Sequence, residues 1–382
     1  MSRPTKPISV LSDNIISPLG RTTDENYRQL KAGVSAIRNH QDQARSPQPF
    51  YASLLSQGLP APDLSSPGAY TLFEQLLIDS AANALEGTGV SLGDPRTVLI
   101  ISSTKGNISL LESDPGQPRP LERISLHSSG LRVAQCLGYN RAPLIVSNAC
   151  ISGLLAMLTG MRLIESGSYD HAVVTGCDLI TKFILSGFQS FQAVSARPCR
   201  PFDLDRDGIT LGEAAATVVL SALGAKQDFI KIRGGSVTND ANHISGPSRT
   251  GEELAMAIGH ALQQAGLSPS EIDFVSAHGT ATPYNDEMEA KAISLAGLRE
   301  VPVNSLKGYY GHTLGAAGLV ESIISLHSLQ DSLVLPTPGY NQPGVSEPIH
   351  ISSNLQPLMR SRNFLKTASG FGGCNAALVF GR

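Results

Sequence analysis

The sequence predicts an α/β protein, built as one continuous molecule with two similar halves. Three observations support this fold class. Short apolar runs rich in β-branched residues recur along the 382 residues, and helix-like stretches lie between them. The runs are nearly continuous in their apolar character, which is typical of strands covered on both faces of a sheet. We expect strands at residues 98–102, 144–147, 172–175, 216–220, 274–277, 301–304 and 376–380.

Two segments between these strands show clear helical spacing. In residues 251–267 the apolar side chains recur at i, i+3, i+4, i+7, i+8 and i+11, which predicts a helix with one buried stripe. That stripe consists of Leu254, Ala257, Ile258, Ala261, Leu262 and Ala265. Residues 319–329 repeat the pattern with Leu319, Val320, Ile323, Ile324 and Leu326.

The composition favours a compact enzyme and argues against several other classes of protein. Charged residues make up 16% of the chain, below the roughly 25% of an average domain, while hydrophobic residues make up 41%. The 29 basic and 32 acidic residues give a net charge of −3. Disorder, collagen-like repetition and a nucleic-acid-coating surface are therefore poorly supported.

The five cysteines and the N-terminal segment indicate a reducing compartment. The cysteines show no C-x-x-C spacing, which argues against a disulfide scaffold or a cysteine-based zinc site. They are Cys136, Cys150, Cys177, Cys199 and Cys374. The first 20 residues lack the features of a secretory signal. The apolar stretch 142–164 is interrupted by polar residues, so we interpret it as a buried strand and helix rather than a membrane span. We expect a cytoplasmic protein.

The chain shows no low-complexity linker. Residues 46–67 and 112–120 are rich in proline or polar residues, and we expect both to be surface excursions. We expect a boundary near residues 225–230, where LGAKQDF interrupts the strand pattern, and we find no second independent core on either side. We therefore divide the chain into an N-terminal half, 1–228, and a C-terminal half, 229–382.

Cys150 is the first candidate for chemistry. An apolar strand runs directly into it, and a helical pattern begins at once. The positive end of the helix dipole is expected to lower the pKa of such a thiol and favour the nucleophilic thiolate. The small residues Ala149, Ser152 and Gly153 would let a substrate approach the turn. A buried structural cysteine is the alternative.

Two further segments carry histidines. His278 closes a predicted strand and is followed by Thr280 and Thr282, at the end of the strand where α/β sheets usually bind ligands. A histidine in a turn is the structural alternative.

The second histidine segment also carries a lysine. Lys307 and His312 precede a Gly/Ala-rich helix, and Glu321 follows nine residues later, where it could fold back to pair with Lys307. A solvated lysine and a capping histidine are the alternative here.

A glycine-rich segment precedes the last predicted strand. Gly370, Gly372 and Gly373 surround Phe371, and such glycines leave backbone N–H groups free to point at an anion. A tight turn is the alternative. Taken together, a thiol, two histidines, a lysine and a donor loop suit acyl transfer through a thioester.

These segments resemble those of the elongating β-ketoacyl-acyl carrier protein synthases, or ketosynthases, of the thiolase-like superfamily. SNACISG resembles their nucleophile motif, and HGTATPYND and KGYYGHTLGAAGLVE resemble their two histidine motifs in the same order. RPFDLDRDGITLGEAAATVVL, DANHISGP, GFGGCNA and the opening ISPLGRTTDENYRQLKAGVSAI also match. The resemblance covers nearly the whole chain.

The resemblance implies a duplicated, five-layered α/β/α/β/α fold and usually a dimer. It implies that an acyl group on Cys150 condenses with malonyl-acyl carrier protein, with loss of CO2, in fatty acid, polyketide or polyene synthesis. His278 and His312 would assist the decarboxylation. No cofactor and no metal would be needed, because the substrates ride on the phosphopantetheine arm of the carrier protein.

The resemblance also assigns the remaining positions. Lys307 and Glu321 would form a supporting ion pair, and Thr280 and Thr282 would bind the phosphopantetheine arm. Phe371 would gate the pocket within a mobile loop that includes Gly372, and the Cys150 and Phe371 N–H groups would form an oxyanion hole.

The partner expected from the resemblance is an acidic carrier protein. We therefore expect a basic patch at the pocket mouth, with Arg197, Arg200 and Arg206 as candidates. Asn148 and Asp286 are expected to have structural roles.

Two alternative functions stay open at this point. The chain could be a non-catalytic or partly catalytic chain-length partner in a heterodimer with a related ketosynthase, although such partners typically lose the nucleophile that is kept here. It could instead be a thiolase, with Cys374 as the second cysteine. Cys374 stands where the family has threonine, and Ile151, the SARPC loop and the VLSDN opening also depart from the family pattern. The branch that uses starter units is disfavoured because both histidines are present.

Overall fold

The described residues, 8–55, 69–112, 121–222 and 229–382, contain one ten-stranded sheet in this computed structural model. Its strand order is β11-β10-β14-β15-β9-β1-β8-β6-β4-β5. Five strands come from the N-terminal half: β1 (Ile8–Ile16), β4 (Thr97–Ser102), β5 (Leu144–Val146), β6 (His171–Asp178) and β8 (Ala214–Ser221). Five come from the C-terminal half: β9 (Lys231–Asn239), β10 (Phe274–Ser276), β11 (Val303–Asn304), β14 (Asn363–Gly370) and β15 (Cys374–Gly381).

The two halves of the sheet have the same topology. Numbered within its own half, each set of five strands has the spatial order 3-2-4-5-1. In each half the last strand pairs antiparallel with both neighbours, while the second strand pairs parallel with the third and fourth. The halves meet where β1 pairs with β9 through Ile8 and Ser9. The chain therefore contains two copies of one five-stranded α/β unit, as the resemblance implied.

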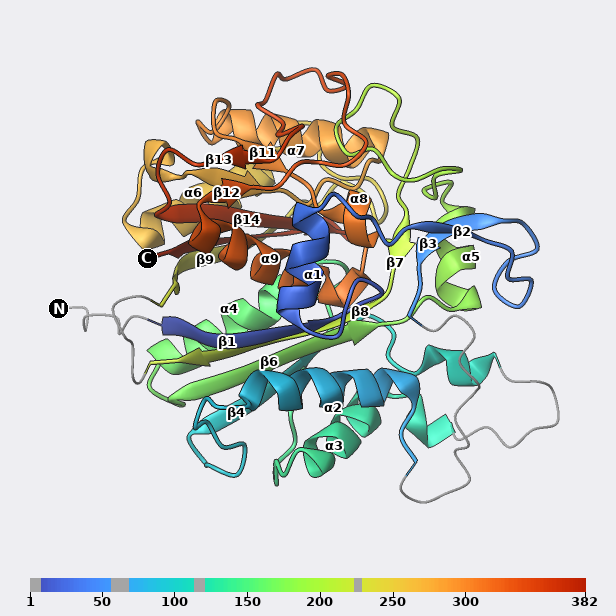
Figure 1. Ribbon diagram of the computed structural model, residues 1–382, viewed down its shortest axis with the longest axis vertical. Helices are drawn as coiled ribbons and strands as arrows, with labels where there is room; N and C mark the ends of the chain where they lie inside the picture. The colour runs from blue at the N-terminus through green and yellow to red at the C-terminus, as the bar shows by residue number, and fades with distance from the viewer. Residues whose placement is uncertain (1–7, 56–68, 113–120, 223–228) are drawn as a thin grey trace.

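The helices complete five layers. The helices at matching positions are α2 (Leu72–Leu85), α3 (Leu126–Cys136) and α4 (Ser152–Glu165) in one half, and α6 (Glu252–Ala265), α7 (Pro283–Leu295) and α9 (Ala317–Asp331) in the other. Figure 1 shows α2 and α3 below the first part of the sheet, α4 and α9 in the middle, and α6 and α7 above the second part. This is the α/β/α/β/α arrangement that the resemblance predicts.

The remaining elements decorate this framework. They are α1 (Thr23–Lys31), β2 (Arg38–His40), β3 (Phe50–Ser53), α5 (Lys182–Ser190), β7 (Leu211–Gly212), α8 (Lys307–Tyr310), β12 (Leu333–Val334) and β13 (Gln356–Pro357), together with four short 3-10 helices at Ile108–Leu111, Leu121–Arg123, Pro269–Glu271 and Leu314–Ala316. Among the described residues, no helix combines the length and the apolar character needed to cross a membrane.

The predicted elements are present, with small differences at their ends. Each of the seven predicted strands overlaps a strand of the sheet, and the six residues of the predicted stripe are the six buried residues of α6. Strands β1, β9 and β14 were not among the predicted strands. Polar residues interrupt the sequence of β1, ISVLSDNII, and glycines and polar residues interrupt those of β9 and β14, KIRGGSVTN and NFLKTASG. Most of the predicted excursions (residues 56–67 and 113–120) and most of the boundary region (residues 225–228) lie outside the described residues.

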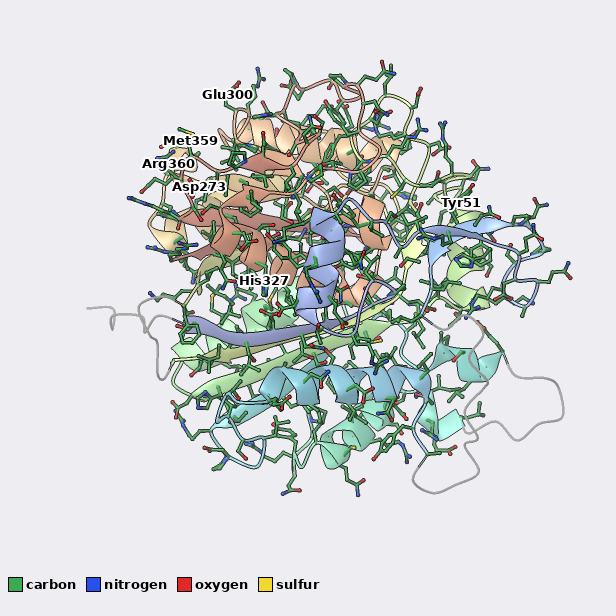
Figure 2. The ribbon with its side chains drawn as sticks, in the orientation of Figure 1. Tyr51, Asp273, Glu300, His327, Met359 and Arg360 are labelled. Carbon is green, nitrogen blue, oxygen red and sulfur yellow. The ribbon has the colours of Figure 1, made fainter. Side chains whose placement is uncertain are left out.

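Figure 2 marks His327 near the end of α9, beside α1. Its Nε2 lies 3.2 Å from a carboxylate oxygen of Asp13 on β1, and its ring lies 5.8 Å from that of Tyr27 on α1. Burial favours a lower pKa for His327, but the hydrogen bond and charge of Asp13 outweigh it, so the pKa lies above its ordinary value. His327 thus joins β1, α1 and α9 on this face.

The two central helices approach each other at glycines. A Cβ atom placed on Gly318 of α9 would lie 2.5 Å from the backbone nitrogen of Leu154 on α4. One placed on Gly153 would lie 2.9 Å from the carbonyl oxygen of Gly315. Both helices are buried around most of their circumference, because they lie between the two parts of the sheet. The glycines therefore set how closely the first turns of α4 and α9 can pack.

Replacing Gly318 with alanine should lower the free energy of unfolding by about 1–3 kcal/mol, because the new methyl group meets backbone atoms that cannot rotate away. Gly259→Ala is the matched control. Gly259 lies within α6 and has open space around it, so alanine there should stabilise the protein by up to about 1 kcal/mol through helix propensity. Urea unfolding of both variants measures the difference, and equal effects would contradict the close approach of the helices.

Candidate active site

Cys150 lies at the sharp turn between β5 and α4. Ala149 adopts a left-handed backbone conformation, with φ of 44°, which turns the chain directly from the strand into the helix. The Ser152 hydroxyl secures this turn, because it accepts a hydrogen bond from the Asn148 N–H at 2.8 Å and donates one to the Ala149 carbonyl at 2.6 Å. Cys150 itself is buried. The turn thus holds the thiol at the N-terminal end of α4.

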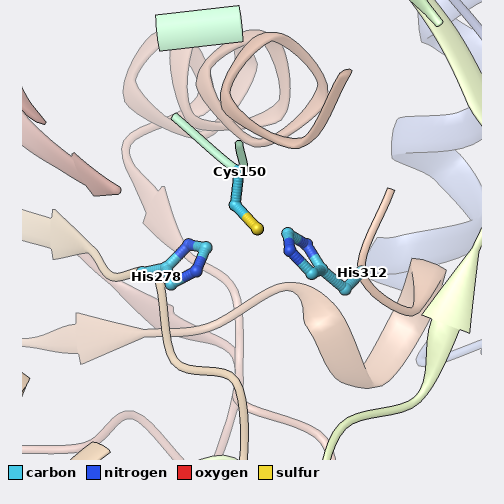
Figure 3. A group of neighbouring side chains, drawn as sticks. All are labelled: Cys150, His278 and His312. Carbon is cyan, nitrogen blue, oxygen red and sulfur yellow. The ribbon is translucent and has the colours of Figure 1, made fainter. Parts of the chain in front are cut away.

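The structure brings Cys150, His278 and His312 together. The Cys150 sulfur and one ring nitrogen of each histidine all lie within 4.8 Å of one another, and the two imidazole rings meet edge to face with centroids 5.3 Å apart. Figure 3 shows the Cys150 sulfur pointing between the two rings. His278 follows β10, and His312 lies between α8 and α9. One half of the chain therefore supplies the thiol and the other half supplies both histidines.

Burial dominates the electrostatics of this trio. It raises the pKa of Cys150 to about 12, with a further contribution from Cys374, while the Lys307 charge and the Phe371 N–H act in the opposite direction. The prediction that the helix terminus lowers this pKa was wrong, because the cost of burying a thiolate exceeds the effect of the dipole. Burial and the charge of Lys307 hold the pKa of both His278 and His312 well below 6.5. At neutral pH the site therefore holds a thiol and two neutral imidazoles.

This electrostatic state predicts how the thiol reacts with iodoacetamide. With a pKa of about 12, the alkylation rate of Cys150 should rise about tenfold per pH unit between pH 7 and 10, without reaching a plateau. Intact-mass spectrometry of a Cys136→Ala variant, which removes the exposed cysteine, would follow the reaction. A plateau below pH 8.5 would mean that the helix terminus, and not burial, controls the thiol.

Lys307 and Glu321 form a buried ion pair next to His278. Lys307 Nζ lies 2.7 Å from Glu321 Oε1 and is itself fully buried. It also donates to the His278 carbonyl and lies 3.3 Å from His278 Nδ1. Because an ammonium can only donate, Nδ1 must accept, and the ring proton of His278 must be on Nε2.

His312 differs from His278 in its hydrogen bonding. Its backbone is fixed, since its N–H donates to the Thr210 carbonyl at 2.7 Å and its carbonyl accepts from the Gly212 N–H at 3.0 Å. Yet neither ring nitrogen has a hydrogen-bond partner among the described residues, although the side chain is 1% exposed. A buried imidazole without hydrogen-bond partners is expected to form hydrogen bonds to a ligand that enters the pocket.

Sequence reasoning missed two charged residues beside His278. Glu289 on α7 accepts hydrogen bonds at 2.7 Å from the backbone N–H groups of His278 and Gly279. Lys366 on β14 is fully buried, and its Nζ lies 2.6 Å from Glu321 Oε2. The only signal for Lys366 in the sequence is a charged residue within an apolar segment.

The predicted threonines lie on the turn between His278 and α7. The Thr280 and Thr282 hydroxyls are 2.8 Å apart, and both residues line the pocket. Asp286, in the first turn of α7, accepts hydrogen bonds from the N–H groups of Thr280, Ala281 and Phe202. Asp286 therefore has the expected structural role. For Asn148, the structure shows only backbone contacts, to Ser152 and to the thiol of Cys374.

The glycine-rich loop closes the site from the other side. The Phe371 N–H points toward the Cys150 sulfur, and a Cβ on Gly370 would lie 3.0 Å from the Cys150 nitrogen. The Gly372 N–H donates to the Ile244 carbonyl at 2.7 Å. The loop is thus in contact with both the thiol and residues of the 240–247 segment.

Aromatic residues surround the mouth of the pocket. The pocket has a volume of about 370 Å³, and both Cys150 and Phe371 line it. The Phe371 ring stacks on Phe188 at 5.6 Å and meets Phe191 edge-on at 5.5 Å. Tyr284 also lines the pocket and is largely exposed. The entrance is therefore largely apolar, which the sequence pattern had not indicated.

The three arginines of the predicted basic patch pair with nearby acceptors. Arg197 lies 3.3 Å from Asp207, and Arg200 lies 3.7 Å from Asp205. Arg206 donates to the carbonyls of Asp203, Gly344 and Pro283. These three arginines are thus engaged with nearby carboxylates or backbone carbonyls, because the same loop carries as many aspartates as arginines.

All five cysteines are free thiols, and Cys136 alone among them is exposed. Cys374 is buried, with its sulfur 3.6 Å from the Phe371 carbonyl and 3.9 Å from the Asn148 carbonyl. Burial raises its pKa to about 11. The Cys374 sulfur is directed at these backbone carbonyls, and Cys374 is not among the described residues that line the pocket. This placement disfavours the thiolase alternative.

Comparison with known proteins agrees with this geometry. Residues 5–225 match the family model "Beta-ketoacyl synthase, N-terminal domain", and residues 229–341 match the C-terminal domain of the same family. The 3-oxoacyl-[acyl-carrier-protein] synthase 2 of Vibrio cholerae is 31% identical, over 98% of this chain and 99% of that protein.

Solved structures show the same likeness. A ketosynthase in complex with its chain length factor, from Xenorhabdus doucetiae, matches with a TM-score of 0.85 and 26% identity, over 100% of this chain and 99% of that one. A beta-ketoacyl synthase from Burkholderia phymatum matches with a TM-score of 0.84 and 25% identity, over 99% of both chains. The chain belongs to the beta-ketoacyl synthase family.

Proposed function

We propose that this protein is a β-ketoacyl-acyl carrier protein synthase that elongates an acyl chain by two carbons. An acyl group carried on Cys150 condenses with malonyl-acyl carrier protein and releases CO2. The single observation that carries the proposal is the buried thiol placed between two neutral imidazoles. The family membership and the similar 3-oxoacyl synthases support it.

In the first step, the Cys150 sulfur attacks the carbonyl carbon of an acyl thioester. Since His278 Nε2 carries a proton, His312 is the neutral imidazole with a free nitrogen to accept the thiol proton. The N–H groups of Cys150 and Phe371 stabilise the oxyanion, and losing one such donor typically costs about 3–4 kcal/mol. The C–S bond to the carrier then breaks, and the pantetheine thiol leaves with the proton.

In the second step, malonyl-acyl carrier protein occupies the pocket. The His278 Nε2–H and one nitrogen of His312 donate to the thioester carbonyl oxygen, which becomes the enolate oxygen as the C–C bond breaks and CO2 leaves. The enolate carbon attacks the acyl carbonyl, the bond to the Cys150 sulfur breaks, and the released thiolate takes up a proton from water. Each neutral imidazole keeps one N–H, so both rings can donate a hydrogen bond to the oxygen on which the negative charge develops.

The proposal extends to the partners and the setting of the enzyme. Thr280 and Thr282 line the pocket, where they would bind the phosphopantetheine arm of the carrier, and Phe371 would gate its entry. The protein would need no cofactor, would work in the cytoplasm, and would pair with a second ketosynthase-like chain. The similar structures that contain a chain length factor support such a pair.

The test uses the purified protein with an acyl-acyl carrier protein and malonyl-acyl carrier protein, and mass spectrometry of both the enzyme and the carrier. We expect an acyl adduct on Cys150 and a β-ketoacyl carrier product. No adduct and no product, unless a related ketosynthase is added, would favour the chain-length partner. Product from acetyl-coenzyme A alone would favour a thiolase.

A further inference from the structure

We propose that Lys366 is a positioning residue for the condensation reaction: together with Lys307 it holds Glu321 and the end of β10, and thereby fixes His278. This inference rests on the proposed function. Lys366 lies in the middle of β14, the strand that leads into the glycine-rich loop, and its side chain is fully buried.

The Lys366 ammonium makes one ion pair and two hydrogen bonds. Nζ lies 2.6 Å from Glu321 Oε2 and donates to the carbonyls of Ser276 at 3.2 Å and Ala277 at 3.0 Å. Lys307 contacts the other oxygen of Glu321 and the carbonyl of His278. The two ammonium groups therefore bind three consecutive carbonyls, and one carboxylate bridges them.

The opposite side of the same backbone is also held. Glu289 accepts from the N–H groups of His278 and Gly279, and from the Thr367 hydroxyl at 2.7 Å. Thr367 is the neighbour of Lys366 on β14. The His278 N–H is thus held by a carboxylate and its carbonyl by Lys307, while Lys366 holds the two carbonyls that precede it. Strand β14 contributes to both sides through Thr367 and Lys366.

Lys366 supplies one of the two buried positive charges that hold the pKa of His278 down. Lys307 and Lys366 are positive, and Glu321 and Glu289 are negative; Cys150 and His312 complete the surroundings of the ring and are neutral. Without Lys366 this cluster carries an excess negative charge. A neighbouring negative charge favours the imidazolium, which cannot serve as the neutral donor that the reaction uses.

Lys366→Met tests this role by removing the charge and keeping most of the volume. We expect malonyl decarboxylation to fall by about 10²-fold at pH 7, while Cys150 acylation changes less than about tenfold. On acidification, the decarboxylation rate should begin to fall at a pH about one unit higher than in the parent. The reason is that losing a positive charge raises the pKa of the histidines. Lys291→Met is the matched control, since Lys291 pairs with Glu287 on the surface.

A double variant separates positioning from simple loss of structure. Lys366→Met with Glu321→Gln removes one charge of each sign, so it should regain at least tenfold in decarboxylation over Lys366→Met alone and should fold even where the single variant does not. An unchanged rate and pH profile in Lys366→Met would overturn the proposal. So would equal losses in both half-reactions with no recovery in the double variant.

Titration of the histidine rings tests the role of Lys366 without relying on the proposed function. Nuclear magnetic resonance of the histidine rings reports the protonation of His278 without any substrate. If the parent protein has no condensation activity, the proposed function fails, and a higher His278 pKa in Lys366→Met still supports the placement of Lys366. An unchanged His278 titration overturns it in either case.

Discussion

Cys150→Ala is expected to lower the rate of condensation by more than about 10⁴-fold, because no other group can carry the acyl intermediate. The thiol points between the two imidazoles, and the only other nearby thiol, Cys374, is directed at backbone carbonyls. The acyl adduct, seen as a mass increase after incubation with acyl-acyl carrier protein, should disappear. Turnover of both carriers, followed by mass spectrometry, measures the loss of rate.

Two controls make this result specific. Cys136→Ala removes the exposed cysteine of α3 and should leave both the adduct and the rate unchanged. Cys374→Ala should keep the adduct, which separates the two buried thiols on either side of Gly370. Retained condensation in Cys150→Ala would refute the proposed mechanism outright.

The sequence allowed much of the site to be predicted because each of its residues follows a recognisable strand end or precedes a helix. Cys150 is a thiol at a strand-to-helix turn, and His278 ends a short apolar strand. Their distance from one another could not be predicted from spacing alone. It depends on the duplicated topology, which places the first turns of α4 and α9 against each other at Gly153 and Gly318.

Residues that act through long-range contacts could not be predicted. In the sequence, Lys366 is a single charged residue with no motif around it. The carbonyls that it binds lie about 90 residues earlier in the chain. Phe188 and Phe191 meet Phe371 only after α5 and the glycine-rich loop are brought together. The pKa of Cys150 depends on how fully the finished fold buries it, whereas the sequence shows only the helix that follows.

His278→Ala should separate the two half-reactions. Its Nε2–H is aimed into the site by Lys307, so it serves the enolate but cannot accept the thiol proton. Decarboxylation of malonyl-acyl carrier protein should therefore fall by about 10²–10⁴-fold, the range for loss of one positioned acid–base or oxyanion group. Acylation of Cys150 should stay within about tenfold of the parent. Released CO2 and the acyl-enzyme mass measure the two steps separately.

His312→Ala provides the contrast, because the free ring nitrogens of His312 serve both steps in the proposed mechanism. It should slow acylation as well as decarboxylation. His260→Ala, an exposed histidine on α6, should change neither rate. If both active-site variants lost the two half-reactions equally, the assignment of the ring proton of His278 to Nε2 would be wrong. The different roles of the two neighbouring histidines therefore depend on one hydrogen bond, from Lys307 to Nδ1 of His278. This bond fixes the His278 ring as a donor at Nε2. The His312 ring, whose nitrogens have no such partner among the described residues, can accept and return a proton.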